Sequence, residues 1–232
     1  MAAKRGDGPK KQSKQTNAAP QPAQEQAGEP PLSRERIVAT AVEMLDAEGT
    51  AGVSMRRLAD RLGAGAMSLY WHVANKEQVL DLALDQVLEY RAPQQAGEPR
   101  DWRGDVAHLL EDWRAGMLRH PWSASLLPRR ALGPGILGRL ELLGGILSRA
   151  GVADADLNAA IWSLWNYVMG ATITRASFDL TDADMAAAQQ RLSTLGERHP
   201  TLERTRLLLD NDWDGTFRKG LDVLLDGLAA RK

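Results

Sequence analysis

Apolar residues recur with helical periodicity over most of the chain from Ser33 onwards. The first stripe occupies positions i, i+3, i+4 and i+7, which is the spacing of one face of an amphipathic helix. It is formed by Val38, Ala41, Val42 and Leu45. Ser33 is suited to cap the start of this helix, and Gly49 is suited to end it. The pattern therefore predicts a first helix between these two residues.

Three shorter helices are predicted next. A stripe over residues 55–62 starts after Ser54 and stops at Gly63. Residues 66–72 are expected to form another short helix after a glycine-containing turn. A fourth helix begins at Asn75, whose side chain and that of Gln78 three positions later are typical of a helix start. Its apolar face is formed by Leu80, Ala83, Leu84 and Val87.

The remainder of the chain shows the same periodicity and no convincing strand. Apolar stripes predict helices over residues 102–117, 134–147, 154–168, 181–195 and 213–228. Pro134 stands where a helix tolerates proline, in its first turn, and Thr181 with Asp184 resembles a capping box. The fold class is therefore all-α, with a small N-terminal group of helices and a larger C-terminal group.

Composition divides the chain further. Residues 1–31 are rich in Gln, Pro, Ala and Lys and have too few apolar residues to form a core, so they are expected to be a disordered tail. Its positive charges leave two uses open, a solvated tail or an arm along DNA. A cluster of Gly, Pro and Gln marks residues 92–100 as a linker. The expected domains are therefore residues 32–91 and residues 101–232.

Several classes of protein are excluded by what the sequence lacks. The chain of 232 residues has no cysteine, which removes disulfides, thiolate metal sites and thiol catalysis. No apolar run approaches the roughly 18 residues of a membrane span, and the N-terminus has no apolar signal-peptide core. The net charge of −1 still permits a local basic surface. We expect a cytoplasmic protein with no membrane partner.

Residues 54–72 follow the plan of a helix-turn-helix, two short helices joined by a glycine-containing turn. The inward positions of the first helix leave Arg56, Arg57 and Arg61 at the surface, where they can reach phosphates. The small residues at the start of the second helix allow a close approach to DNA. Tyr70, Trp71 and His72 have two possible roles, contact with DNA or packing of an aromatic knot against neighbouring helices.

The run from Leu69 to Lys76, preceded by residues 55–63, resembles the DNA-binding domain of the TetR repressor family, in particular its tetracycline repressor branch. The resemblance implies a DNA contact from Arg56 and a phosphate clamp at Lys76. It further implies these recognition-helix positions: base-facing Ala66, Met67 and Ser68, and phosphate-contacting or packing Tyr70, Trp71 and His72. Ala66 and Met67 replace the branch's glutamine and proline, so the operator sequence should differ.

The resemblance also implies a homodimer on a double-stranded, palindromic operator. The dimer would form through the helices over residues 154–177 and 212–228, unless these helices only complete the monomer's core. Small residues that permit close helix approach are Ala159, Ala160, Ser163, Gly170 and Ala171.

Clustered tryptophan and methionine residues in the C-terminal part suit a small apolar or aromatic effector. The candidate pocket residues are Trp113, Met117, Trp162, Trp165 and Met169. Leu127 and Ala92 occupy the positions of the branch's metal-binding and drug-binding histidines, so neither tetracycline with magnesium nor any other metal or cofactor is expected. No catalytic motif is found. The alternatives are a non-inducible dimeric DNA-binding protein and, less favoured, an all-α enzyme.

Overall fold

The computed structural model describes residues 31–90, 101–130, 133–178, 181–195, 198–205 and 212–230. The predicted tail, apart from Pro31, and the predicted linker at 92–100 lie outside these residues. The division into domains at 32–91 and 101–232 therefore stays a prediction. Within the described ranges the regular elements are helices and none is a strand, which confirms the all-α class.

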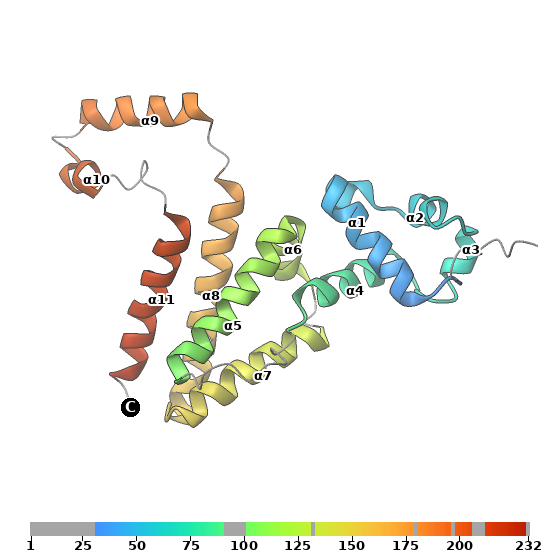
Figure 1. The fold of residues 1–232 in the computed structure, drawn as a ribbon, viewed down its shortest axis with the longest axis horizontal. Coiled ribbons are helices and arrows are strands. Elements are labelled where there is room, and N and C mark those ends of the chain that lie inside the picture. Colours follow the sequence, from blue (N-terminus) through green and yellow to red (C-terminus); the bar gives the residue numbers. More distant parts are fainter. Residues whose placement is uncertain are drawn as a thin grey trace, which may run out of the picture. The chain divides into compact units, whose positions relative to one another are not determined.

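Capping side chains mark the starts of three of the four helices in the N-terminal half, and glycines with positive φ interrupt or follow two of them. The four helices are α1 (Arg34–Gly52), α2 (Met55–Arg61), α3 (Ala66–Leu69) and α4 (Lys76–Leu88) (Figure 1). The side chains of Ser33, Ser54 and Asn75 accept hydrogen bonds from the third backbone N–H of α1, α2 and α4. Gly49 breaks the regular helix with φ of +66°, and Gly63 turns the chain after α2 with φ of +64°. The predicted caps at Ser33, Ser54 and Asn75 are confirmed, whereas Gly49, which was expected to end the first helix, interrupts α1 three residues before its end at Gly52.

The C-terminal half contributes the remaining helices. They are α5 (Trp102–Arg119), α6 (Pro121–Leu126), the 3₁₀ turn η1 (Leu127–Arg129), α7 (Pro134–Arg149), α8 (Asp154–Ser177), α9 (Asp182–Leu195), α10 (Pro200–Thr205) and α11 (Trp213–Ala229). Thr181 and Asp184 exchange hydrogen bonds as a capping box should. No helix in the described ranges combines the length and apolarity needed to cross a bilayer.

Three details differ from the predicted elements. The helix expected over residues 66–72 ends at Leu69, and the chain continues in turns through His72. The two short helices α6 and α10 were not predicted, because six residues are too few to show a periodic stripe.

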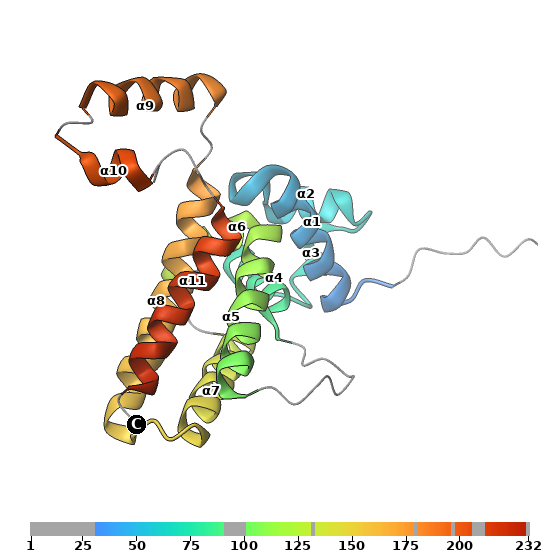
Figure 2. The ribbon, with the colours of Figure 1, turned by 60° about the vertical axis from the view of Figure 1, so that its left-hand side comes forward.

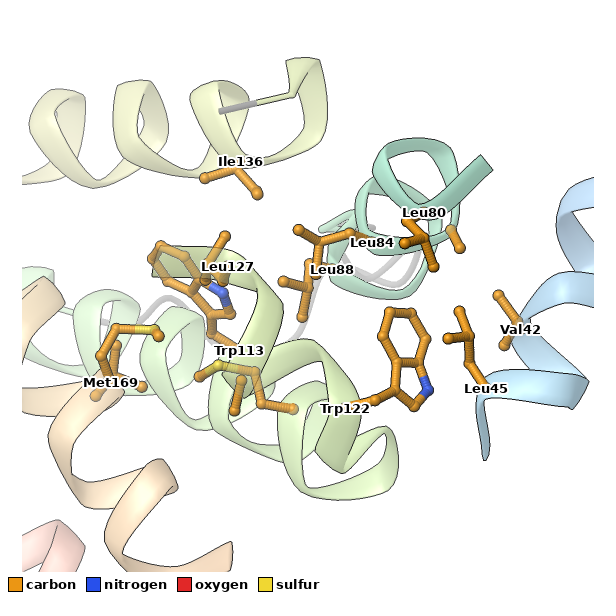
Figure 3. Close-up of a cluster of buried hydrophobic side chains, with 14 of the residues drawn as sticks. Val42, Leu45, Leu80, Leu84, Leu88, Trp113, Trp122, Leu127, Ile136 and Met169 are labelled. Atoms are coloured by element: carbon orange, nitrogen blue, oxygen red, sulfur yellow. The ribbon is translucent and has the colours of Figure 1, made fainter. Parts of the chain in front are cut away.

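The core runs through α4, which packs against α1 on one side and against α5, α6 and α7 on the other. The buried face of α4 is formed by Val79, Leu80, Ala83, Leu84 and Leu88. Figure 3 shows the continuity, with Trp122 of α6 beside Leu45 of α1 and with Trp113 of α5 among side chains of neighbouring helices. One apolar cluster therefore extends from the first helices into the C-terminal half.

The last long helices lie side by side, α8 against α11, in both views (Figures 1 and 2). Tyr167 of α8 stacks on Phe217 of α11 with ring centres 5.2 Å apart, and its hydroxyl donates to the Phe217 carbonyl at 2.7 Å. In the single chain, part of the apolar surface of the α8–α11 pair is accessible to solvent, since Trp162 and Val223 are exposed.

We expect Gly138→Ala to stabilise the fold. Gly138 lies inside α7, and a Cβ added there would meet no atom within 4 Å. Replacing an unstrained helical glycine by alanine contributes about 0.5–1 kcal/mol. Thermal unfolding of the variant should therefore show a higher midpoint than that of the unmodified chain.

Gly63→Ala is the matched control, because its positive φ is unfavourable for alanine and should cost about 1–2 kcal/mol. A lower unfolding midpoint for Gly138→Ala would show that the added methyl group collides with a neighbouring group at this position of α7.

Candidate nucleic-acid interface and effector site

The helix-turn-helix is positioned by buried leucines. Leu58 and Leu62 anchor α2, and Leu69 anchors α3, each almost completely buried. The turn between the helices is closed by backbone hydrogen bonds, including one from the Ala64 N–H to the Ala59 carbonyl at 3.0 Å. The short α3 is therefore anchored by the buried Leu69, while its other side chains are exposed to solvent.

The side chains around Leu69 point outward. Met67 is 75% exposed, Trp71 is 88% exposed and Tyr70 is 47% exposed. An aromatic knot would bury Trp71, so that interpretation is wrong for this residue. Large apolar side chains exposed next to each other mark an interaction surface. Ala66 and Ser68 are also exposed, and His72 is half-buried with its carbonyl accepting a hydrogen bond from Arg34 at 3.2 Å.

The three arginines of α2 are not equivalent. Arg57 is paired with Glu48 at 2.7 Å, and this contact raises the pKa of Arg57 and lowers the pKa of Glu48. Arg57 was expected to be available for phosphates, but its charge is already balanced within the chain. Arg56 and Arg61 are exposed and have no ionic partner among the described residues. They remain the free cations of this helix.

Lys76, the first residue of α4, is tied to the end of α1. Its ammonium group donates to the Thr50 carbonyl at 3.1 Å. A lysine ammonium has further N–H groups to offer, so this hydrogen bond orients the charge without using it up. The hydrogen bond to the Thr50 carbonyl therefore holds Lys76 close to the helix-turn-helix.

Four of the five predicted effector residues meet in the C-terminal core. Trp113 and Trp165 pack edge to face with ring centres 4.8 Å apart, and Met117 and Met169 are buried in the same apolar cluster. Trp162 contacts Trp165 with ring centres 5.8 Å apart but is 47% exposed. The structure therefore places Trp162 at the edge of the aromatic group and the other four inside it.

A charged residue that sequence reasoning missed lies in the same place. Arg139 of α7 is only 2% exposed, and its guanidinium lies 5.6 Å from the ring centre of Trp113. It donates to the Leu88 carbonyl at 2.6 Å and to Asp112 at 2.8 Å. Burial lowers the pKa of Arg139, and the Asp112 carboxylate opposes that shift. Arginine is seldom buried, so the pattern gave no reason to place it inside.

Two of the hollows in the described part of the chain lie between α8 and another long helix. One, of about 750 Å³, lies between α7 and α8 and is lined by Gly138, Leu140, Gly144, Ile161 and neighbouring residues. The other, of about 370 Å³, lies between α8 and α11 and is lined by small residues such as Ala159, Ala160, Ser163 and Gly227. The predicted effector residues line neither hollow, because four of them are packed inside the core.

A helix-turn-helix with exposed Met67, Tyr70 and Trp71, followed by a larger all-α unit, is typical of a helix-turn-helix transcription regulator. Two family models match the chain, "Bacterial regulatory proteins, tetR family" over residues 37–83 and "Tetracyclin repressor-like, C-terminal domain" over residues 94–232. The chain belongs to the TetR family of DNA-binding transcriptional regulators.

Relatives agree with this assignment. A helix-turn-helix-type transcriptional regulator of Saccharopolyspora erythraea is 38% identical over 90% of this chain and 89% of its own length. The helix-turn-helix-type transcriptional repressor DrrR1 of Streptomyces coeruleorubidus is 34% identical over 86% of this chain and 78% of its own. The structure of ActR from Streptomyces coelicolor in complex with actinorhodin has a TM-score of 0.74 and 32% identity, covering 86% of this chain and 96% of that one.

We expect Trp71→Ala to weaken DNA binding about tenfold or more, the effect of losing one good contact, while leaving stability almost unchanged. An exposed side chain far from any core contact alters unfolding by only about 0.5 kcal/mol. Thermal unfolding and fluorescence anisotropy on a labelled duplex measure the two effects.

Leu69→Ala is the matched contrast, because truncating a buried leucine costs about 2–5 kcal/mol. A clear loss of stability in Trp71→Ala, or unchanged DNA affinity, would show that this face is not the DNA-binding surface.

Proposed function

We propose that the chain is a homodimeric repressor that binds a palindromic operator and is released from it by a small apolar or aromatic effector. The observation that carries the DNA-binding part is the exposure of Met67, Tyr70 and Trp71 around the buried Leu69. Large apolar side chains exposed next to each other indicate an interaction surface, and in a TetR-family chain the partner of the helix-turn-helix is DNA.

The proposal assigns two kinds of DNA contact. Arg56 and Lys76 bind phosphates, since Arg56 has no ionic partner among the described residues and Lys76 is oriented by one backbone hydrogen bond. Base edges are reached from the first residues of α3, namely Ala66, Met67 and Ser68. Tyr70, Trp71 and His72 follow the recognition positions and add phosphate and sugar contacts. Phosphate contacts determine affinity, and base contacts determine sequence preference.

Selection of bound duplexes from a random pool tests the DNA-binding proposal and supplies the operator for later measurements. Lys76→Ala and Arg56→Ala should weaken binding to all duplexes, and Lys76→Ala should lower the log–log salt slope by about 1, because one phosphate contact is lost. Substitutions at Met67 or Ser68 should change which duplex is selected.

Glu43→Gln, on an exposed position of α1, is a surface control that should change neither property. A changed sequence preference for Lys76→Ala, with an unchanged preference for the Met67 variants, would reverse the assignment of the two faces.

Dimerisation through α8 and α11 is supported by what these helices leave uncovered. Val223 is 69% exposed, Trp162 is exposed too, and small residues form the hollow between the helices. An α8–α11 pair from each chain would bury these side chains in a four-helix bundle. Such a dimer presents two recognition helices about 34–36 Å apart to successive major grooves.

We expect Val223→Asp to convert the dimer to a monomer, because a carboxylate placed in an apolar interface loses its hydration. Sedimentation velocity at micromolar concentration measures the change, and operator affinity should fall with it. Leu137→Asp introduces the same charge at an exposed apolar position of α7 and should leave the dimer intact. A Val223→Asp chain that still sediments as a dimer would place the interface elsewhere.

The effector part of the proposal rests on the aromatic core and on a relative. The ActR structure contains actinorhodin, so a protein of this fold at 32% identity binds a small molecule. We assign the site here to Trp113, Met117, Trp162, Trp165 and Met169. A ligand releases DNA only when it binds the released arrangement of the dimer more tightly. A non-inducible regulator would instead show no ligand-dependent change in operator affinity.

A further inference from the structure

The outward surface of α3 is centred on Met67. Each residue of an α-helix is rotated about 100° from the one before it, so a residue two positions from another lies about 200° around the helix axis. Met67 stands two positions before the buried Leu69 and therefore faces almost directly away from the core. It is 75% exposed, and Ala66 and Ser68 on either side of it are exposed as well. Met67 is thus the longest side chain that α3 presents to a partner.

The chemistry of this surface is unusually poor in groups that read bases by hydrogen bonding. Residues 62–74 contain no Arg, Lys, Asn, Gln, Asp or Glu. Guanine is read by a guanidinium or ammonium group, adenine by an amide and cytosine by a carboxylate. The hydroxyl of Ser68 can donate or accept, so it suits several base edges equally. No side chain of α3 can therefore select one base through a directed pair of hydrogen bonds.

Thymine is the base that an apolar side chain can distinguish. In the major groove it presents a C5 methyl group, whereas the other three bases present hydrogen-bonding groups without a methyl. A methionine side chain is flexible and polarizable, so it can follow the position of such a methyl group. Contact between the two removes apolar surface from water, which favours binding. The side chains that α3 exposes therefore match the methyl edge of thymine.

We propose that Met67 contacts the C5 methyl group of one thymine in each half of the operator. This inference rests on the proposed function and adds the kind of base that is recognised. The small side chain of Ala66 allows α3 to approach the base edge closely. 5-Methylcytosine carries the same methyl group at C5, so it is recognised at this position better than unmodified cytosine. The preference for one operator then comes from the burial of a methyl group, and the phosphate contacts of Arg56 and Lys76 add affinity.

Replacement of thymine by uracil tests the contact on the full-length chain. Uracil differs from thymine only in lacking the methyl group. Selection from a random pool should give half-sites that share a thymine at one symmetric position. Uracil there should weaken binding about fourfold in one half-site and about 15-fold in both, the effect of losing one or two buried methyl groups. Fluorescence anisotropy measures the change, and uracil at thymines outside the half-sites is the control duplex.

Cytosine and 5-methylcytosine give a second pair of duplexes that differ by the methyl group alone. Each is placed at the same position, paired with guanine, so that hydrogen bonding in the groove is identical within the pair. We expect the methylated duplex to bind about fourfold tighter than the unmethylated one, because one methyl group is again buried.

Variants then separate a direct contact from an effect of the methyl group on DNA shape. Met67→Ala should bind the thymine and uracil duplexes equally, because the side chain that reaches the methyl group is removed. Met67→Leu retains a large apolar side chain and should keep the preference for thymine. Met185→Ala makes the same substitution in α9 and should keep it too. Met67 is exposed, so its variants should unfold at the midpoint of the unmodified chain.

Three results would overturn the inference. They are selected half-sites that share no thymine, equal binding of the thymine and uracil duplexes by the unmodified chain, and a preference for thymine that persists in Met67→Ala. Loss of the preference in Met185→Ala would likewise show that it does not depend on α3. Failure of the unmodified chain to select any duplex would instead contradict the proposed function itself, and this inference with it.

Discussion

The arrangement of this regulator depends on α4 being held from both sides. Its buried residues face α1, which supports the helix-turn-helix, and they also face α5, α6 and α7. Its first residue, Lys76, is bonded to the end of α1, and its last residue, Leu88, is bonded to Arg139. The two hydrogen bonds therefore connect the end of α1 and Arg139 of α7 to opposite ends of the same helix.

The contacts that join the two halves combine a continuous apolar core with directional polar pairs. Asp46 of α1 accepts hydrogen bonds from His120 at 2.8 Å and from Trp122 at 2.7 Å. Arg130 bridges two carboxylates of α4, and the Gly135 N–H donates to Asp85 at 2.7 Å. Apolar contacts tolerate small sliding motions, whereas hydrogen bonds of this kind are either made or broken. Such a combination favours a few discrete arrangements over continuous deformation.

Residues with strong local preferences could be predicted from the sequence. Ser33, Ser54, Asn75 and Pro134 mark the helix starts that the structure shows, because capping and proline chemistry act within a few residues. The place of Arg139 could not be predicted, since its burial depends on carbonyls and carboxylates contributed by other helices. The exposure of Trp71 could not be predicted either, because sequence spacing alone does not distinguish an aromatic residue packed in the core from one that faces a partner.

The pairing of charges across the two halves also has an electrostatic consequence. Glu77 and Asp81 of α4 pair with Arg130, and Asp46 of α1 hydrogen-bonds to His120; both partners belong to the C-terminal half. Arg56 and Arg61 have no such partner among the described residues, and Arg130 offsets part of the negative charge that α4 carries. A fragment containing only the first four helices would lack Arg130 and therefore the cation that offsets Glu77 and Asp81. The electrostatic potential at the helix-turn-helix therefore depends on the C-terminal half as well as on the DNA-binding unit itself.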